Sequence, residues 1–214
     1  MSQTATIKFE SGIEVERYNV TKNDNYPFWC QSPVVIVGTP RSGTSTVARI
    51  MHEYFGICMG TAWYNQVESN PAGNFEDKDL VDTNQDFIED RITLSQWEFR
   101  LMKFFHKMEK LGGPWGFKDP RMIRLVGAVL PYFKKCTIIR TYRPAELCVP
   151  SRVKYLGWSH KSSSVSYVMD MATLDRLLSH YEHIKIDFTE QLNDIDIIKS
   201  ISKQSRKIYD SQTR

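Results

Sequence analysis

The chain has 214 residues, of which 41% are hydrophobic and 25% charged, the balance of a globular protein with room for one sizeable core. Its net charge of +3 excludes the strongly basic composition of most nucleic-acid-binding domains, so we expect no nucleic-acid partner. It has no run of roughly 20 apolar residues, no apolar signal-peptide core and no CxxC pair among its four cysteines, which predicts a cytoplasmic protein without a membrane span.

The first segment alternates apolar and polar residues. Ile7 and Val15 lie on either side of Ser11-Gly12, which predicts a small β-hairpin over residues 6–20. Residues 21–32 are polar and rich in turn-forming types. We therefore expect a hairpin and linker over residues 1–32, followed by a single α/β domain over residues 33–214.

The domain begins with an unbroken β-branched run at residues 34–37, typical of a central parallel strand buried on both faces. A loop over residues 38–43 follows, and then a helix over residues 44–55. A helix or helix pair follows Phe75 and ends at the break over residues 112–114.

Strands and helices then alternate to the end of the chain. Strands are predicted at 115–117, 136–140 and 184–186, and helices around 123–130, 145–157, 164–181 and 189–203. Polar residues around Trp158 and His160 and the serine run 162–164 favour a loop there, a candidate lid. The alternation predicts an α/β fold in three layers: a parallel sheet flanked by helices, with a P-loop-like first crossover.

The loop from Gly38 to Ser45 stands between a buried strand and a helix, where backbone N–H groups converge at the positive end of a helix dipole. Gly43 lets the backbone approach an oxygen closely, and Arg41 adds a donor fork that matches phosphate or sulfate. Thr44 and Ser45 add hydroxyl groups. The pattern predicts a phosphate site.

A nucleoside-triphosphatase loop would have lysine at the position of Thr44 and an acidic residue at the end of a neighbouring strand to hold Mg²⁺. The strand over residues 136–140 ends in arginine instead. This disfavours ATP chemistry and predicts a phosphate site without a metal. A P-loop small-molecule kinase and a non-catalytic nucleotide-binding module remain the alternatives.

At these residues the chain resembles the sulfotransferases that use 3′-phosphoadenosine-5′-phosphosulfate (PAPS). The family's 5′-phosphosulfate loop runs Pro-[Arg/Lys]-Ser-Gly-Thr-[Ser/Thr], and it is matched by Pro40, Arg41, Ser42, Gly43, Thr44 and Ser45. The resemblance implies that these residues bind PAPS as the donor and that 3′,5′-adenosine bisphosphate (PAP) is the product.

The family's 3′-phosphate element is a strand ending in arginine with a serine eight residues later, and Arg143 and Ser151 have that spacing. The family usually has one residue between arginine and proline, whereas Pro144 follows Arg143 directly. The resemblance therefore implies Arg143 and Ser151 as 3′-phosphate ligands, with Arg140 as a residue that shares or takes over the role.

Two further segments, 70–77 and 116–121, resemble the bacterial and viral-type branch of the family. Through them the resemblance implies that Lys118 joins Arg41 at the reacting group and that Glu76 is the general base. Asp77, Asp119 and His52 are the other candidates for the base.

The resemblance implies a small-molecule or glycan acceptor with a hydroxyl or amine group, and the sequence does not distinguish a sugar hydroxyl from a phenol, a lipid, a peptide tyrosine or an amine. Trp63, Tyr64 and Phe75 form a candidate acceptor pocket. His180 and His183 have a spacing compatible with a metal but no evident third ligand, so we expect no metal. The sequence predicts no oligomeric state.

Overall fold

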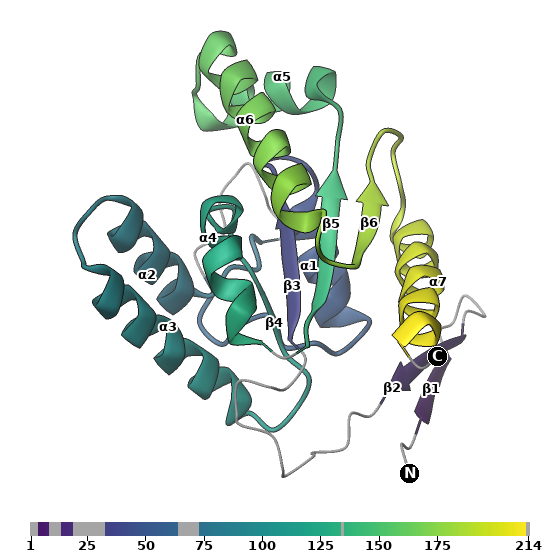
Figure 1. Ribbon diagram of the computed structural model, residues 1–214. Helices are drawn as coiled ribbons and strands as arrows, with labels where there is room; N and C mark the ends of the chain where they lie inside the picture. The colour runs from purple at the N-terminus through teal and green to yellow at the C-terminus, as the bar shows by residue number, and fades with distance from the viewer. Residues whose placement is uncertain (1–3, 9–13, 19–32, 64–72, 134, 213–214) are drawn as a thin grey trace.

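Four parallel strands form the central sheet in the order β4 (Gly116–Lys118), β3 (Val34–Gly38), β5 (Thr137–Tyr142) and β6 (His183–Asp187) (Figure 1). The computed structural model describes residues 4–8, 14–18, 33–63, 73–133 and 135–212. Every residue of β3 is buried, as its β-branched composition predicts for a strand covered on both faces.

One face of the sheet is covered by α1 (Thr44–Glu53) and α7 (Asp194–Gln212). Isoleucines on alternate strand positions, such as Ile36, Ile139 and Ile184, pack here against apolar residues of both helices. This is the first of the two helical layers.

The opposite face is covered by α4 (Met122–Val129) and α6 (His160–Leu178), with the pair α2 (Lys78–Ile88) and α3 (Leu94–Glu109) beside them (Figure 1). Its core contains the alternate set of strand residues, Val35, Val37, Phe117 and Ile138, together with aromatic side chains from outside the strands, among them Trp97, Phe104, Phe105 and Trp115. The predicted three-layer α/β arrangement is confirmed.

The helix pair predicted after Phe75 has well-defined starts. Asp77 caps α2 by accepting from the N–H of Asp79, and Thr93 and Gln96 form a capping box at the start of α3. The pair ends before the glycine-proline break, as predicted.

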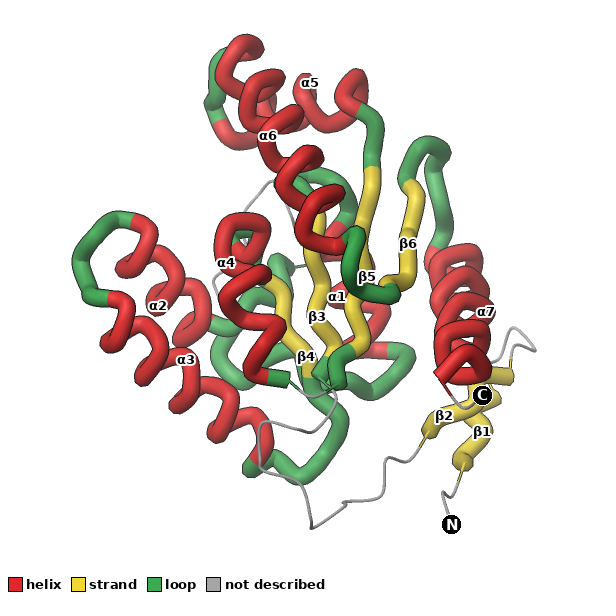
Figure 2. The backbone as a smooth tube through the Cα atoms, viewed as in Figure 1, coloured by secondary structure: helices red, strands yellow, loops and turns green. Residues whose placement is uncertain are grey.

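Helices α5 (Ala145–Leu156) and α6 form a hairpin in which α5 and the first part of α6 stand beyond the carboxyl end of the sheet, and α6 then runs back over the face of the sheet (Figure 2). The loop predicted over the serine run 162–164 is wrong. Ser159 caps α6 by accepting from the N–H of Ser162, so the serines lie in the first turns of a helix. The connection between the helices is only the short segment 157–159.

The strands β1 (Thr4–Lys8) and β2 (Glu14–Tyr18) pair antiparallel, with Ile7 opposite Val15, as the hairpin prediction requires. Cys30, Tyr64 and the start of the segment 70–77 lie outside the described residues. Among the helices that the structure describes, none is long and apolar enough to cross a membrane.

Candidate active site

Three basic side chains meet at the carboxyl edge of the sheet, each carried by the end of a different strand. Lys118 closes β4, Arg41 follows β3 and Arg143 follows β5. The connection after β3 leads to β4 on one side, whereas that after β5 leads to β6 on the other, so β3 and β5 form the switch point at which α/β proteins bind ligands.

A pocket of about 310 Å³ opens at this edge. It is lined by Pro40, Arg41, Gly43, Thr44, Ser45, Thr46, Asn74, Glu76, Lys118, Pro120, Arg143 and Leu156. The lining contains one acidic and three basic side chains, so its charge suits an anionic ligand.

The loop after β3 begins with a tight turn. The N–H of Ser42 donates to the carbonyl oxygen of Thr39 at 3.0 Å, Pro40 occupies the second position, and Arg41 has a φ of 70°. Only a type II turn combines proline at the second position with a positive φ at the third, where glycine is the usual residue. Arg41 is therefore held in a strained conformation.

Gly38 allows β3 and β5 to approach closely where the loop begins. A Cβ atom on Gly38 would lie 2.0 Å from Thr141 Oγ1, and that hydroxyl is 2.7 Å from Ser42 Oγ. The hydroxyl pair ties the loop to the neighbouring strand. Gly38 is required because any side chain would occupy the position of this contact.

The N-terminus of α1 faces the same pocket. Its N-cap is Gly43, with a φ of 94° and no side-chain cap, and its first turn contains no acidic residue. The first N–H groups of a helix have no partner within the helix and carry its positive dipole end. Together with the hydroxyls of Thr44, Ser45 and Thr46, they form a site suited to phosphate or sulfate oxygens.

Arg41 is positioned by helix α5. Its Nε donates to Ser151 Oγ at 3.0 Å, and its guanidinium lies 4.7 Å from the ring centroid of Tyr155, one helical turn further on. An Arg143 guanidinium nitrogen donates to the carbonyl oxygen of Arg41 at 3.2 Å. Burial, with the nearby charge of Arg143 adding to it, lowers the pKa of Arg41.

Lys118 and Glu76 form a buried ion pair at the other side of the pocket. The Lys118 Nζ lies 2.5 Å from Glu76 Oε1, and the two side chains are 2% and 10% exposed. The same ammonium donates to Ser45 Oγ at 3.1 Å and to the carbonyl oxygen of Asn74 at 3.2 Å. Lys118 thereby connects the loop from Gly38 to Ser45, called the phosphate loop below, with the segment that carries Glu76.

A sequence model described as the sulfotransferase family matches residues 33–199. The chain belongs to the sulfotransferase family. No protein in the curated set matches the chain. The sulfotransferase segment contains every residue that lines the pocket and all four strands of the central sheet. The protein is therefore a transferase, and its family chemistry is the transfer of a sulfuryl group.

The structure brings together most of the site residues inferred from the sequence of this sulfotransferase. Five of the six loop residues line the pocket with Lys118, Glu76 and Arg143, and Ser151 contacts Arg41 from behind it. Ser42 does not line the pocket, because its buried side chain points to the Thr141 hydroxyl. Arg140 lies elsewhere. Its guanidinium pairs with Asp175 of α6 at 2.6 Å, on the face of the sheet that α4 and α6 cover.

The other acids considered as the base have structural partners. Asp77 accepts from the N–H groups of Thr61, Ala62 and Asp79 and is 1% exposed. One of its oxygens therefore caps α2, and the other holds the backbone of the segment at Thr61 and Ala62.

Asp119 and His52 lie outside the pocket lining as well. Asp119 accepts from the Asn84 amide at 2.9 Å and from the Arg121 guanidinium at 2.8 Å. The His52 ring packs edge-on against Trp63, with ring centroids 5.3 Å apart, and also contacts Phe75. Among the described aromatic candidates for an acceptor pocket, Trp63 and Phe75 contact each other but do not line the cavity.

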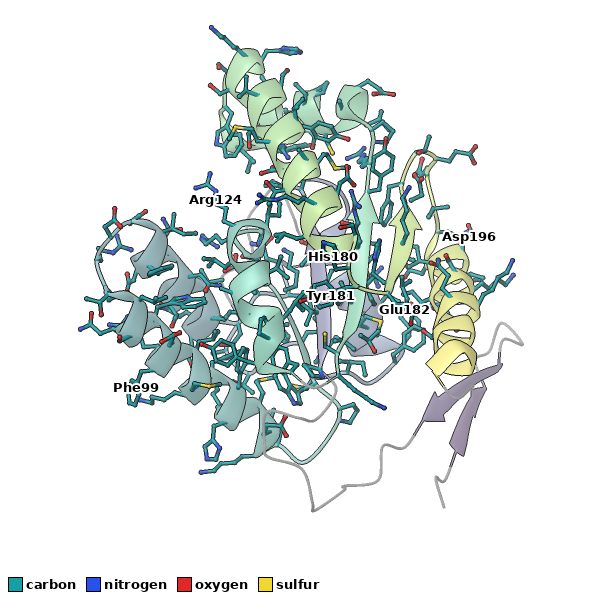
Figure 3. All side chains as sticks on the ribbon, viewed as in Figure 1. Phe99, Arg124, His180, Tyr181, Glu182 and Asp196 are labelled. Carbon is teal, nitrogen blue, oxygen red and sulfur yellow. The ribbon has the colours of Figure 1, made fainter. Side chains whose placement is uncertain are left out.

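The structure describes no group of three or more His, Cys, Asp or Glu side chains that could hold a metal ion. His180 lies with Tyr181 and Glu182 in the turn between α6 and β6, at the end of α6 away from its hairpin with α5 (Figure 3).

Sequence reasoning missed the contribution of α5 beyond Ser151. Tyr155 stacks on Arg41, Leu156 lines the pocket, and Arg152 donates to the carbonyl oxygen of Pro40. One signal was present, because Ser151 and Tyr155 are four residues apart and so share a helix face. Arg152 gave no signal, since nothing local distinguishes a buried arginine from a solvated one.

Proposed function

We propose that this sulfotransferase uses PAPS as its donor, releases PAP, and sulfates a hydroxyl or amine group of a small-molecule or glycan acceptor in the cytoplasm. The observation that carries the proposal is the convergence of Arg41, Lys118 and Arg143 with the N-terminus of α1 on a pocket that also contains one buried acid, Glu76. Such a site suits a ligand with several anionic oxygens and a reaction that needs a proton acceptor.

The pocket residues fit a nucleotide with phosphate groups at two positions. The loop amides, Thr44, Ser45 and Arg41 would hold the 5′-phosphosulfate. Arg143 would hold the 3′-phosphate with Ser151, which lies one hydrogen bond from Arg41. The two arginines are adjacent through the Arg41 carbonyl, so one side of the pocket has two cations for two anionic groups.

In the reaction, PAPS supplies the sulfuryl group. Glu76 accepts the acceptor's proton as a new S–O or S–N bond forms, and the bond from sulfur to the 5′-phosphate oxygen breaks in line. Lys118 and Arg41 stabilise the negative charge that develops on the departing phosphate oxygen. No metal has a role in this scheme.

The ion pair between Lys118 and Glu76 supports these roles. One amine reaches both the loop hydroxyl of Ser45 and the acid, so the groups proposed for leaving-group stabilisation and proton removal are adjacent. A sulfuryl transfer needs both groups within a few ångströms of the reacting atoms.

The two alternatives have less support. A kinase of the P-loop class would have lysine at Thr44 and an acid after a neighbouring strand to hold Mg²⁺, whereas β5 is followed by Arg143. Asp119 follows β4, but its carboxylate lies outside the pocket lining and accepts from Asn84 and Arg121. A non-catalytic nucleotide-binding module would have no use for a proton acceptor in the pocket, yet Glu76 lines it and its side chain is only 10% exposed.

Calorimetric titration with PAP and with Mg-ATP tests the proposal. We expect PAP to bind more tightly, and Arg41→Ala to weaken that binding while Arg176→Ala, at an exposed position on α6, leaves it unchanged. Tighter binding of Mg-ATP would contradict the donor assignment. A screen of acceptors with ³⁵S-labelled PAPS then identifies the acceptor class, and transfer to none of them would favour the non-catalytic alternative.

A further inference from the structure

Arg152 is the one arginine among the described residues that has no solvent exposure, and it lies behind the phosphate loop rather than in the pocket. Its Nε donates to the carbonyl oxygen of Pro40 at 3.1 Å, and its two terminal nitrogens donate to the carbonyl of Ser163 at 3.3 Å and to Asp170 at 3.1 Å. Taking a charged pair out of water costs desolvation free energy even when its hydrogen bonds are made, so the burial of Arg152 calls for a reason beyond packing.

The side chains around Arg152 hold it in a single orientation. Its guanidinium carbon lies 5.7 Å from the ring centroids of both Trp158 and Tyr167. Asp170 fixes the far end of the guanidinium, so the Nε–H has one direction in which to donate. That direction is the carbonyl of Pro40.

The Pro40 carbonyl belongs to the central peptide of the type II turn. Type I and type II turns differ mainly by rotation of this peptide, and the rotation moves φ of the third residue from about −90° to about +80°. Arg41, with a φ of 70°, has the less favourable of the two conformations for a residue other than glycine. A donor aimed at the Pro40 oxygen stabilises that orientation selectively.

The same rotation determines where the loop presents Arg41. The C=O and N–H of a trans peptide point in opposite directions, so holding the Pro40 oxygen toward Arg152 turns the Arg41 N–H to the other side of the loop. It also fixes the Cα–Cβ direction from which the Arg41 side chain reaches Ser151 and the pocket.

We propose that Arg152 is a positioning residue for donor binding: it latches the Pro40–Arg41 peptide in the type II orientation and so presents Arg41 to the donor. This inference rests on the proposed function, because the donor is the ligand whose affinity it sets. The latch connects the loop to α6 as well, through Ser163 and Asp170.

The test compares PAP affinity in two backgrounds by NMR titration, which follows dissociation constants into the millimolar range. In the natural background, Arg152→Met is expected to raise the dissociation constant about tenfold, the ratio that corresponds to releasing a non-glycine residue from the left-handed conformation. In the Arg41→Gly background the same substitution is expected to change it less than about twofold, because glycine adopts a φ of 70° without strain.

Thermal melting identifies the variants that are folded at the assay temperature. Should Arg152→Met not fold, Arg152→Lys keeps a buried cation for Asp170, but its ammonium lacks the planar donor set that reaches Pro40, Ser163 and Asp170 together, so it serves in the same comparison. Arg176→Met, at an exposed arginine of α6, is the matched control and is expected to bind PAP normally.

The outcomes separate the two claims. A natural protein that does not bind PAP contradicts the proposed donor. With PAP binding intact, an unchanged affinity in the Arg152 variants, or an equal loss in both backgrounds, overturns the latch, because a merely structural role would not depend on glycine at position 41.

Discussion

Separating the two members of the buried Lys118–Glu76 pair is expected to affect stability and turnover differently. The pair has an Nζ–Oε1 distance of 2.5 Å, and its side chains are 2% and 10% exposed. Lys118→Met would leave a buried carboxylate without its cation, which typically costs about 3–5 kcal/mol of unfolding free energy. Glu76→Gln keeps an oxygen that can accept from Lys118, so we expect a loss of about 1–2 kcal/mol.

Both substitutions are expected to lower turnover, but for different reasons. If Glu76 removes the acceptor's proton, Glu76→Gln lowers turnover by about 10²–10⁴-fold while PAP affinity is retained, because the amide is no base. Lys118→Met lowers turnover as well, since it removes a cation next to Ser45 and the developing charge.

Urea unfolding, PAP titration and transfer of ³⁵S from PAPS measure the three quantities for each single variant and for the double variant. The double variant is expected to be more stable than Lys118→Met alone, because it contains no unpaired carboxylate. Lys78→Met removes one member of an exposed pair with Asp82, whose side chains are 58% and 45% exposed, and should cost at most about 1 kcal/mol. Near-normal turnover of Glu76→Gln would refute the assignment of the base.

Three further outcomes follow from the packing around the sheet. Gly43→Ala places a Cβ 2.5 Å from the Phe188 ring at a φ of 94°, so urea unfolding should show a loss of at least about 1–2 kcal/mol and titration a weaker PAP affinity; no change in either would contradict the close approach. Burial raises the pKa of Cys136 to about 11, leaving about one thiol in a thousand ionised at pH 8, so mass spectrometry should find native alkylation far slower than in urea, and equal rates would refute this. Burial also raises the pKa of Glu109, although the hydrogen bond from Trp115 opposes the shift. The free energy of unfolding that the protonated Glu109 contributes is therefore complete below the ordinary pKa of the group and is lost as pH rises through the raised pKa. Urea unfolding between pH 4 and 7 should show this loss of stability in the natural protein but not in Glu109→Gln, and parallel curves would show that Glu109 is not the source.

The parts of the site that the sequence predicts are those set by local chemistry. An unbroken β-branched strand, a glycine at each end of a short loop, and hydroxyl residues at a helix start all act within a few residues of one another. The loop from Gly38 to Ser45 was therefore predicted together with the strand before it and the helix after it. The hairpin and the alternation of strands and helices followed from the same kind of local pattern.

The choice between Arg140 and Arg143 depended on where a strand ends, which is not a local property. The strand was expected to end at Arg140, but β5 continues to Tyr142 because Thr141 and Tyr142 pair with β6. Strand alternation then turns Arg140 toward α6 and Asp175, and Arg143 becomes the first residue beyond the sheet.

The serine run and Arg152 were misread or missed for a related reason. Serines favour loops, but the Ser159 hydroxyl accepts from the free N–H of Ser162 in the first turn of α6, and the helix continues through the serine run. Arg152 resembles a solvated helix residue in the sequence. Its burial arises only when α5, α6 and the phosphate loop are packed together.

The hairpin of α5 and α6 holds the side of the pocket that carries Arg41 and Arg143. Tyr167 of α6 donates to the Arg143 carbonyl at 2.8 Å, while Arg152 of α5 holds the Pro40 carbonyl. Both segments that carry Arg41 and Arg143, the arginines proposed to bind the two phosphate groups, are thereby held through their backbone from outside the pocket. The side chains can then meet an anionic ligand without losing further conformational freedom, which is what a preorganised site requires. Because neither Tyr167 nor Arg152 lines the pocket, the proposed latch implies that the affinity for the donor depends partly on residues that never touch it.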